Sequence, residues 1–247
     1  MPDDLAPLPA TGRRFSSQRR VRLGDVSPGG RLRLDALARF LQDVSGDDSD
    51  DAAIDEDGRG WVVRRTVVEV RRAAVLGASV DLVTWCSGIG SRWAERRVTL
   101  RAAEGGHVEA ATLWVYVDIA TGRPSRLPPR FDEFFAESAA GRRVTARLRH
   151  PPPPPNGASA RRWPLRFCDF DVLGHVNNAS YWEAVEEELA DRRRLRAPVR
   201  AELEYGAGIN LGAAVDILAV DEPDDGLAVW LVADGVVAAS ARLYTIR

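Results

Sequence analysis

Lysine is absent from the chain, so all 34 basic residues are arginine, and 36 acidic residues leave a net charge of −2. The sequence therefore lacks the basic excess typical of nucleic-acid-binding chains, and nucleic acid is not an expected partner. Cysteine is scarce as well: Cys86 and Cys168 are too few for a disulfide framework or a cysteine-ligated zinc site. No apolar run reaches the roughly 18 residues of a membrane-spanning helix, which excludes a transmembrane protein.

The composition that remains is that of a soluble globular protein, with 247 residues of which 45% are hydrophobic and 28% charged. This length allows one large domain or two small ones. Residues 1–14 carry acidic side chains where a secretory signal has basic ones, and they contain no apolar core segment. A cytoplasmic location is therefore expected.

The first half of the chain predicts one strand, one helix and then several strands. Spaced apolar residues favour a half-exposed strand over 15–23, and turn chemistry follows at 25–30. Apolar residues then recur at helical spacing and predict an amphipathic helix over Leu34 to Val44. The acidic run at 46–51 lacks the glycine and final glutamate of a calcium-binding hand loop and is interpreted as a solvated loop. From Gly60 to Ile119, β-forming residues joined by glycine-bearing turns predict antiparallel strands.

A proline-rich stretch separates this half from the next. Residues 137–162 include five consecutive prolines, Pro151 to Pro155, and show no apolar periodicity. These features favour an extended, stiff linker. The predicted domains are therefore 1–136 and 163–247, with the linker between them.

The second half repeats the element order of the first. Residues 163–169 predict a strand, Ala179 to Arg194 predict a helix, and four further stretches alternate as strands. Asp25 and Asp171 take equivalent places after the first strand of each half. Each half is long enough for a small α+β domain, so a tandem of two such domains is expected.

The segment Arg166 to Trp182 places an acid, an imidazole and two amides between a strand end and a helix start. Unpaired backbone N–H groups and the positive end of the helix dipole favour developing negative charge at such a position. Asp171 precedes His175 by four residues, so both side chains can project around one turn, and Asn177 or Asn178 can cap the helix. The segment is a candidate oxyanion site, although Asp171 taken alone also fits an Asx turn at a strand end.

Asp169 to Tyr181 resembles the D-x-D-x-x-G-H-V-N-N-x-x-Y signature of hotdog-fold thioesterases. The tandem layout, with a first-half strand that begins Trp61-Val62-Val63-Arg64-Arg65 and another that contains Thr84-Trp85, resembles the fatty acyl-ACP thioesterases of plants and bacteria. The resemblance implies an α+β tandem hotdog, in which two antiparallel sheets are each wrapped around a long central helix, side by side as a pseudo-dimer. It also implies that the first-half helix and its strands form the acyl-chain pocket.

The resemblance assigns the catalytic acid and histidine to Asp171 and His175. We expect Asp171 to act as general base or nucleophile, His175 to orient it or the water, and helix N-terminal amides near Asn177 to hold the thioester oxygen. No metal or cofactor is needed. The predicted substrate-binding residues are Gly174, Asn178 and Tyr181.

Several positions depart from the family pattern. The acyl-ACP enzymes carry an asparagine two residues after the acid, where this chain has Leu173, and a Glu-Cys pair that aligns here with Gly208 and Ile209. The groups that orient water in the plant enzymes are therefore incomplete. In the first half, Gly29 stands at the place of His175 and no Asn-Asn pair follows, so one active site per chain is expected.

The remaining polar groups are interpreted as structural or solvated. His107 and His150 are expected in surface loops, and Cys168 is expected to be a small apolar residue on a strand. The glutamates of the second helix are expected mostly on a solvated face; they are Glu183, Glu186, Glu187 and Glu188.

The leading functional hypothesis is hydrolysis of a fatty acyl thioester, with acyl carrier protein (ACP) preferred over coenzyme A as the carrier. Arginine clusters at Arg64-Arg65 and Arg192 to Arg194 are candidate docking surfaces for an acidic ACP. The alternatives are a hotdog enoyl-acyl hydratase, which the spacing of Asp171 and His175 disfavours, and a non-catalytic acyl-binding protein. The chain is expected to act as a monomeric pseudo-dimer or a homodimer.

Overall fold

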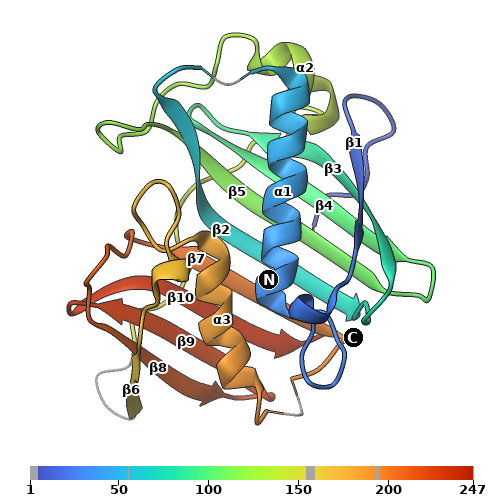
Figure 1. Cartoon of the computed structure of the whole chain (residues 1–247). Coiled ribbons are helices and arrows are strands. Elements are labelled where there is room, and N and C mark those ends of the chain that lie inside the picture. The colour runs from blue at the N-terminus through green and yellow to red at the C-terminus, as the bar shows by residue number, and fades with distance from the viewer. Residues whose placement is uncertain (1–4, 55, 154–158, 193–194, 247) are drawn as a thin grey trace.

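The computed structural model describes residues 5–54, 56–153, 159–192 and 195–246. Ten strands form one antiparallel sheet, and the two long helices α1 and α3 lie side by side on the same face of it (Figure 1). None of the helices in these residues is long and apolar enough to cross a membrane.

The two halves have the same element order. The first half contains β1 (Phe15–Arg20), the short helix η1 (Leu23–Asp25), α1 (Leu34–Ala52), β2 (Arg59–Arg72), β3 (Ser79–Ile89), β4 (Trp93–Ala102), β5 (His107–Asp118) and α2 (Phe131–Ala139). The second half contains β6 (Ser159–Trp163), η2 (Phe167–Asp169), α3 (Asn178–Leu189), β7 (Val199–Tyr205), β8 (Val215–Glu222), β9 (Gly226–Ala233) and β10 (Val236–Thr245). The predicted helices are both present, with α1 longer and α3 shorter than expected.

The strand order is β1-β3-β4-β5-β2-β7-β10-β9-β8-β6, so each half contributes five strands in the same relative order. The two sets of strands were expected as separate sheets, but they are joined edge to edge because β2 and β7 pair antiparallel. That pairing runs from Arg65 opposite Glu204 to Val70 opposite Val199. One buried apolar cluster accordingly includes residues of both halves, among them Leu37 of α1 and Val185 of α3.

Helix α1 continues through the acidic run that was expected to be a solvated loop. Asp48 is fully buried and accepts hydrogen bonds from the guanidinium groups of Arg13 and Arg96. Asp47 and Asp51 face outward and pair with arginines of the N-terminal segment. The run was misinterpreted because a buried carboxylate is stable only with charged partners, and these partners are distant in the sequence.

The strand predicted over 163–169 is also corrected. Strand β6 ends at Trp163, and residues 167–169 form the short helix η2, because the Asp169 carboxylate accepts a hydrogen bond from the backbone N–H of Arg166 at 2.7 Å. Cys168 therefore lies on η2, where it is exposed rather than packed as a small apolar residue. Residues 193–194, at the predicted end of the second helix, lie outside the described residues.

Residues 144–150 of the predicted linker are docked on the sheet face opposite α1 and α3, whereas its last residues, 159–162, belong to β6 and pair with β8. The Trp93 indole donates to the carbonyl of Val144, and the backbone N–H groups of Arg149 and His150 donate to the buried Glu204 carboxylate. His150 was expected in a surface loop, but its side chain is only 7% exposed and lies next to Ser240. Since α2 extends to residue 139, the domain boundaries predicted at 136 and 163 stay predictions.

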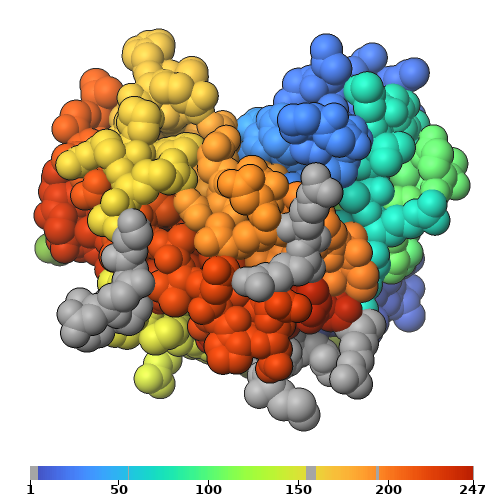
Figure 2. Space-filling model, turned by 90° about the horizontal axis from the view of Figure 1, so that it is seen from below, coloured from blue at the N-terminus to red at the C-terminus, as the bar shows by residue number. Residues whose placement is uncertain are grey.

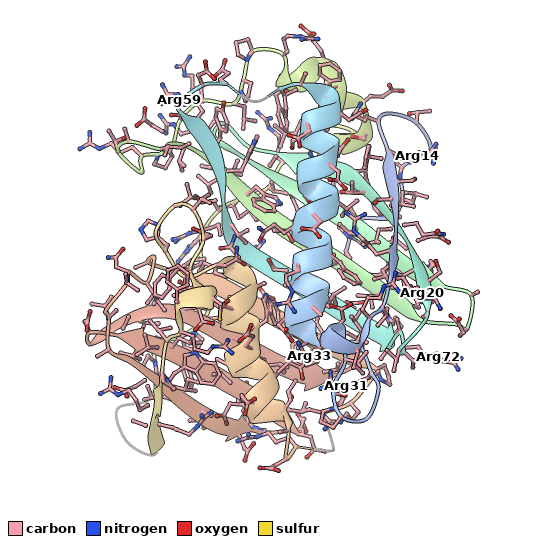
Figure 3. All side chains as sticks on the ribbon, in the orientation of Figure 1. Arg14, Arg20, Arg31, Arg33, Arg59 and Arg72 are labelled. Atoms are coloured by element: carbon pink, nitrogen blue, oxygen red, sulfur yellow. The ribbon has the colours of Figure 1, made fainter. Side chains whose placement is uncertain are left out.

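The expectation for Glu186 is corrected as well, because this residue is buried instead of solvated. Its carboxylate accepts hydrogen bonds from both terminal nitrogens of Arg31 and from the backbone N–H of Leu34, the first residue of α1. Figure 3 shows Arg31 at the lower end of α1, beside α3. This one carboxylate therefore connects the start of the first-half helix to the middle of the second-half helix.

We expect Glu186→Gln to lower the free energy of unfolding by about 2 kcal/mol. Breaking a buried ion pair costs about 3–5 kcal/mol, and the partial exposure of Arg31 reduces that cost. Glu187→Gln, at an exposed position one residue further on, should change stability by less than about 0.5 kcal/mol. Chemical denaturation of both variants measures the difference, and equal stabilities would show that Glu186 does not hold the halves together.

Candidate active site

Asp171 and His175 lie on a tight turn between η2 and α3. The backbone N–H of Asp171 donates to the carbonyl of His175 at 3.0 Å, and that of Gly174 donates to the carbonyl of Asp171 at 3.0 Å. Gly174 has φ +77°, which favours glycine. One Asp171 carboxylate oxygen accepts from the N–H of Leu173 at 2.9 Å, so Asp171 does form the Asx turn, while its other oxygen has no hydrogen-bond partner among the described residues.

The first half contains the same turn with different side chains. The N–H of Ser27 donates to the carbonyl of Arg31, and that of Gly30 donates to the carbonyl of Ser27, both at 2.8 Å. Ser27 is therefore the counterpart of Asp171, and Arg31 is the counterpart of His175. This half has neither the acid nor the imidazole, in line with the expectation of one site per chain.

The predicted equivalence of Asp25 with Asp171, and of Gly29 with His175, is therefore wrong by two residues. Asp25 matches Asp169 instead, because each carboxylate accepts from the backbone N–H three residues earlier. The repeat was misaligned because the first half has one acidic residue here, Asp25, where the second half has two, Asp169 and Asp171, and only the turn geometry shows which of them it matches.

Asn177 and Asn178 take different positions at the start of α3. The side-chain oxygen of Asn177 caps α3 by accepting from the N–H of Ala179 at 2.9 Å, and this side chain does not line the cleft. Asn178 is the first residue of α3 and does line it. Its backbone N–H has no hydrogen-bond partner among the described residues, as is usual in the first turn of a helix.

The cleft lies at the fork between β2 and β7. Their pairing ends at Arg65 and Glu204, beyond which the first residues of β2 and the segment after Tyr205 diverge. The resulting cleft has a volume of about 550 Å³. Its lining includes four of the six predicted site residues, namely Asp171, His175, Asn178 and Tyr181, and also Leu173 and Val176 of the motif. Gly174 and Asn177 are not among the lining residues.

Gly208 lies directly against the imidazole of His175. A Cβ atom at position 208 would be only 2.8 Å from Cδ2 of the ring, so any side chain there would displace the imidazole. The backbone next to it is tied to the motif, since the N–H of Val176 donates to the carbonyl of Ile209. In this chain the ring of His175 therefore occupies the space that a glutamate at position 208 would need.

A buried aromatic group supports the start of α3. The Trp182 indole donates to the Tyr205 hydroxyl at 3.0 Å, and that hydroxyl donates to the carbonyl of Asn178 at 3.1 Å. The rings of Tyr181 and Tyr205 meet edge to face with centroids 5.3 Å apart. Burial raises the pKa of Tyr181 to about 12, so this phenol stays neutral beside the cleft at physiological pH.

A second cavity of about 200 Å³ lies between α1 and the sheet of the first half. It exists because α1 presents Ser45, Gly46 and Ser49 at this point instead of large apolar side chains. Trp61 lines both this cavity and the cleft. The cavity lies where the family resemblance implies the acyl-chain pocket.

A groove and a cluster of possible metal ligands, both among the described residues, lie outside this cleft. On the side of the helices a groove of about 610 Å³ is visible in Figure 2, where it is lined largely by mutually paired charged groups such as Arg166 and Glu183. On the opposite face, His150, Glu202 and Glu204 bring possible metal-ligand atoms within 4.8 Å of one another. Glu204 already accepts two backbone N–H groups there, and none of the three residues lines the cleft.

Two helix-and-sheet units joined side by side, with an acid and an imidazole in the cleft between them, define a thioesterase of the hotdog class. Residues 12–136 match the acyl-ACP thioesterase N-terminal domain, and residues 154–238 match the acyl-ACP thioesterase C-terminal domain. The chain belongs to the acyl-ACP thioesterase family. It hydrolyses fatty acyl thioesters and releases the fatty acid, so the predicted activity and the predicted tandem hotdog fold are both confirmed.

Several known proteins are similar along most of this chain. An uncharacterized protein of Mycobacterium tuberculosis is 32% identical over 240 residues, which cover 97% of this chain and 95% of the relative. The chloroplastic acyl-(acyl-carrier-protein) hydrolase FATB3 of Cuphea viscosissima is 25% identical over 73% of this chain and 48% of its own length. The structure of the 12:0-ACP thioesterase from Umbellularia californica has a TM-score of 0.78 at 21% identity, covering 94% of this chain and 96% of that one.

Proposed function

We propose that this chain hydrolyses fatty acyl thioesters carried on ACP, with Asp171 and His175 as the catalytic pair. The observation that carries the proposal is the meeting of three residues in one cleft: Asp171, His175 and Asn178, the first residue of α3. Trp61 connects this cleft to the cavity under α1, which accommodates the acyl chain.

The reaction follows from these positions. The free oxygen of Asp171 acts as general base toward a water molecule or attacks the thioester carbon itself, and His175 orients the attacking group. Negative charge that develops on the carbonyl oxygen is stabilised by the N–H at the start of α3. The carbon–sulfur bond then breaks, and the departing sulfur leaves as the free thiol with the proton that Asp171 took from the water. If Asp171 attacks instead, the sulfur takes its proton from solvent, and a water molecule then hydrolyses the mixed anhydride on Asp171 to release the fatty acid. Asn177 supports this arrangement as the helix cap, and no metal or cofactor takes part.

The carrier preference rests on charge around the cleft rather than on the arginines named from the sequence. Arg65 is buried in the seam between β2 and β7, so it is not available for docking, and Arg192 pairs with Glu188 and Asp221. Three exposed arginines instead adjoin cleft-lining residues in the sequence: Arg92, Arg123 and Arg147 are neighbours of Trp93, Pro124 and Ala146. An acidic ACP would be attracted to this rim.

Reversing these three arginines to glutamate should lower kcat/KM for acyl-ACP about tenfold at low salt, with a smaller loss for acyl-CoA. The loss should fade as ionic strength rises, because steering between exposed charges is screened by salt. A control reverses Arg14, Arg20 and Arg72, three exposed arginines of which the first two lie at the edge strand β1 and the third at the end of β2 (Figure 3). Equal losses of kcat/KM in the two triple variants would count against ACP docking at the cleft. A loss that stays the same as ionic strength rises would also count against it. The cytoplasmic location and the oligomeric state stay predictions.

A further inference from the structure

Arg64 lies at the fork of the cleft on an irregularity of β2. The register of β2 against β5 shifts between Val63 and Arg65, so Arg64 is the extra residue of a β-bulge. A bulge takes a residue out of the regular alternation of side chains and directs it elsewhere. While Arg65 is buried in the seam of the sheet, Arg64 is half-buried and lines the cleft.

The guanidinium of Arg64 is held by backbone carbonyls across the fork. Its Nη1 donates to the carbonyl of Tyr205 at 2.7 Å and to that of Gly206 at 3.1 Å. Neither Nε nor Nη2 has a partner among the described residues, and both nitrogens can donate. One part of the guanidinium therefore anchors the side chain while another is free to bind a ligand.

The fixed guanidinium and the imidazole of His175 line the same cleft and lie against the same segment of the chain. Gly206 contacts the guanidinium, and Gly208, two residues further along the same segment, contacts the ring of His175. Two residues span at most about 7 Å, so both groups lie against one short stretch of the cleft wall. Arg64 is also the only arginine among the described residues that line the cleft.

We propose that Arg64 is a further catalytic residue, which binds the thioester carbonyl oxygen and stabilises the negative charge that develops on it. This inference rests on the proposed function. As the attacking oxygen bonds to the carbonyl carbon, the electron pair of the C=O bond moves to this oxygen, and it returns when the carbon–sulfur bond breaks and the thiol leaves. A charge-assisted hydrogen bond from Arg64 strengthens during this step.

The position of Arg64 favours the carbonyl over the carrier as its ligand. The phosphate common to ACP and coenzyme A lies at the far end of the pantetheine arm from the sulfur, whereas Arg64 lines the same cleft as His175. Leu173 and Gly208 moreover offer no polar side chain to the reacting carbonyl. Arg64 supplies a charged donor at this point.

The test uses a short thioester without carrier or phosphate, acyl-N-acetylcysteamine, alongside acyl-ACP. Arg64→Met should lower kcat about a hundredfold on both substrates with little change in KM, the scale expected for one lost oxyanion donor. Arg72→Met, at an exposed position at the end of the same strand, should retain wild-type values. A loss confined to acyl-ACP, or confined to KM, would overturn the proposal, because it would place Arg64 in carrier binding.

Adding guanidinium ion to the Arg64→Ala variant distinguishes a catalytic role of Arg64 from a role in supporting the backbone where β2 and β7 diverge. Millimolar guanidinium should restore part of kcat on the short thioester, because the ion can occupy the vacated place. An inactive variant that guanidinium does not restore, and whose melting temperature is well below that of the wild type, would mean that Arg64 only supports the fold. If the wild type releases no thiol from either substrate, the proposed function is wrong. If the wild type is active and the Arg64 variants are equally active, only the inference about Arg64 is wrong.

Discussion

Asp171→Asn should lower kcat for a fatty acyl thioester by about a hundredfold or more while leaving the fold intact. Asparagine retains a side-chain oxygen that can accept from the N–H of Leu173, so the Asx turn is preserved. The change removes the negative charge, and with it the capacity to take a proton or to attack the thioester carbon. The loss of a positioned acid or base typically costs about 10²–10⁴ in rate.

The comparison variant for this measurement is Asp234→Asn. Asp234 also accepts a backbone N–H through its side chain, from Ala214 at 3.0 Å, and its φ of +48° is one that asparagine tolerates. It lies outside the cleft lining, so its turnover should equal that of the wild type. Wild-type turnover in the Asp171 variant would show that the carboxylate is only a turn residue.

His175→Ala should have an effect of similar size, again about a hundredfold or more on kcat. The ring is exposed and packs against Gly208, so its removal should cost little stability. A melting temperature close to that of the wild type together with this loss of turnover would separate catalysis from folding. His107→Ala, which removes a half-buried imidazole paired with Glu109 on β5, serves as the matched variant. If both histidine variants lost activity equally, the assignment of His175 would be wrong.

The pattern of apolar residues was sufficient to predict the order of the helices and strands, because each long element has its own periodicity. The helical spacing from Leu34 to Val44 and the alternation of the strands predicted two equivalent units in the correct order. The joining of the two sheets through β2 and β7 is a tertiary property. It depends on which strand edges pair in the folded chain, and the hydropathy of a strand does not show which neighbour it will pair with.

Several of the missed features involve charges whose partners are distant in sequence. Asp48 and Glu186 look like solvated helix residues until Arg96 and Arg31 are brought to them by folding. Arg64 was grouped with Arg65 as a surface pair, although the bulge sends one into the cleft and the other into the sheet. A bulge depends on the partner strand, so strand alternation alone does not reveal it.

The candidate site was largely predictable because the motif is local. Asp171, His175, Asn178 and Tyr181 lie within eleven residues of sequence, and one turn and one helix start bring them together. The opposite wall of the cleft comes from β2, more than 100 residues earlier in the chain, and its contribution emerged only with the fold. The first-half turn shows that this backbone geometry alone is not a site, since Arg31 there serves a structural ion pair with Glu186.

The most direct test of the account is incubation of the wild-type chain with acyl-ACP and acyl-CoA of several chain lengths, with free thiol and free fatty acid measured together. We expect both products to appear in equal amounts without added metal or cofactor, and faster from acyl-ACP than from acyl-CoA. Binding of the acyl thioesters without release of any thiol would contradict this expectation and would identify the chain as a non-catalytic acyl-binding protein.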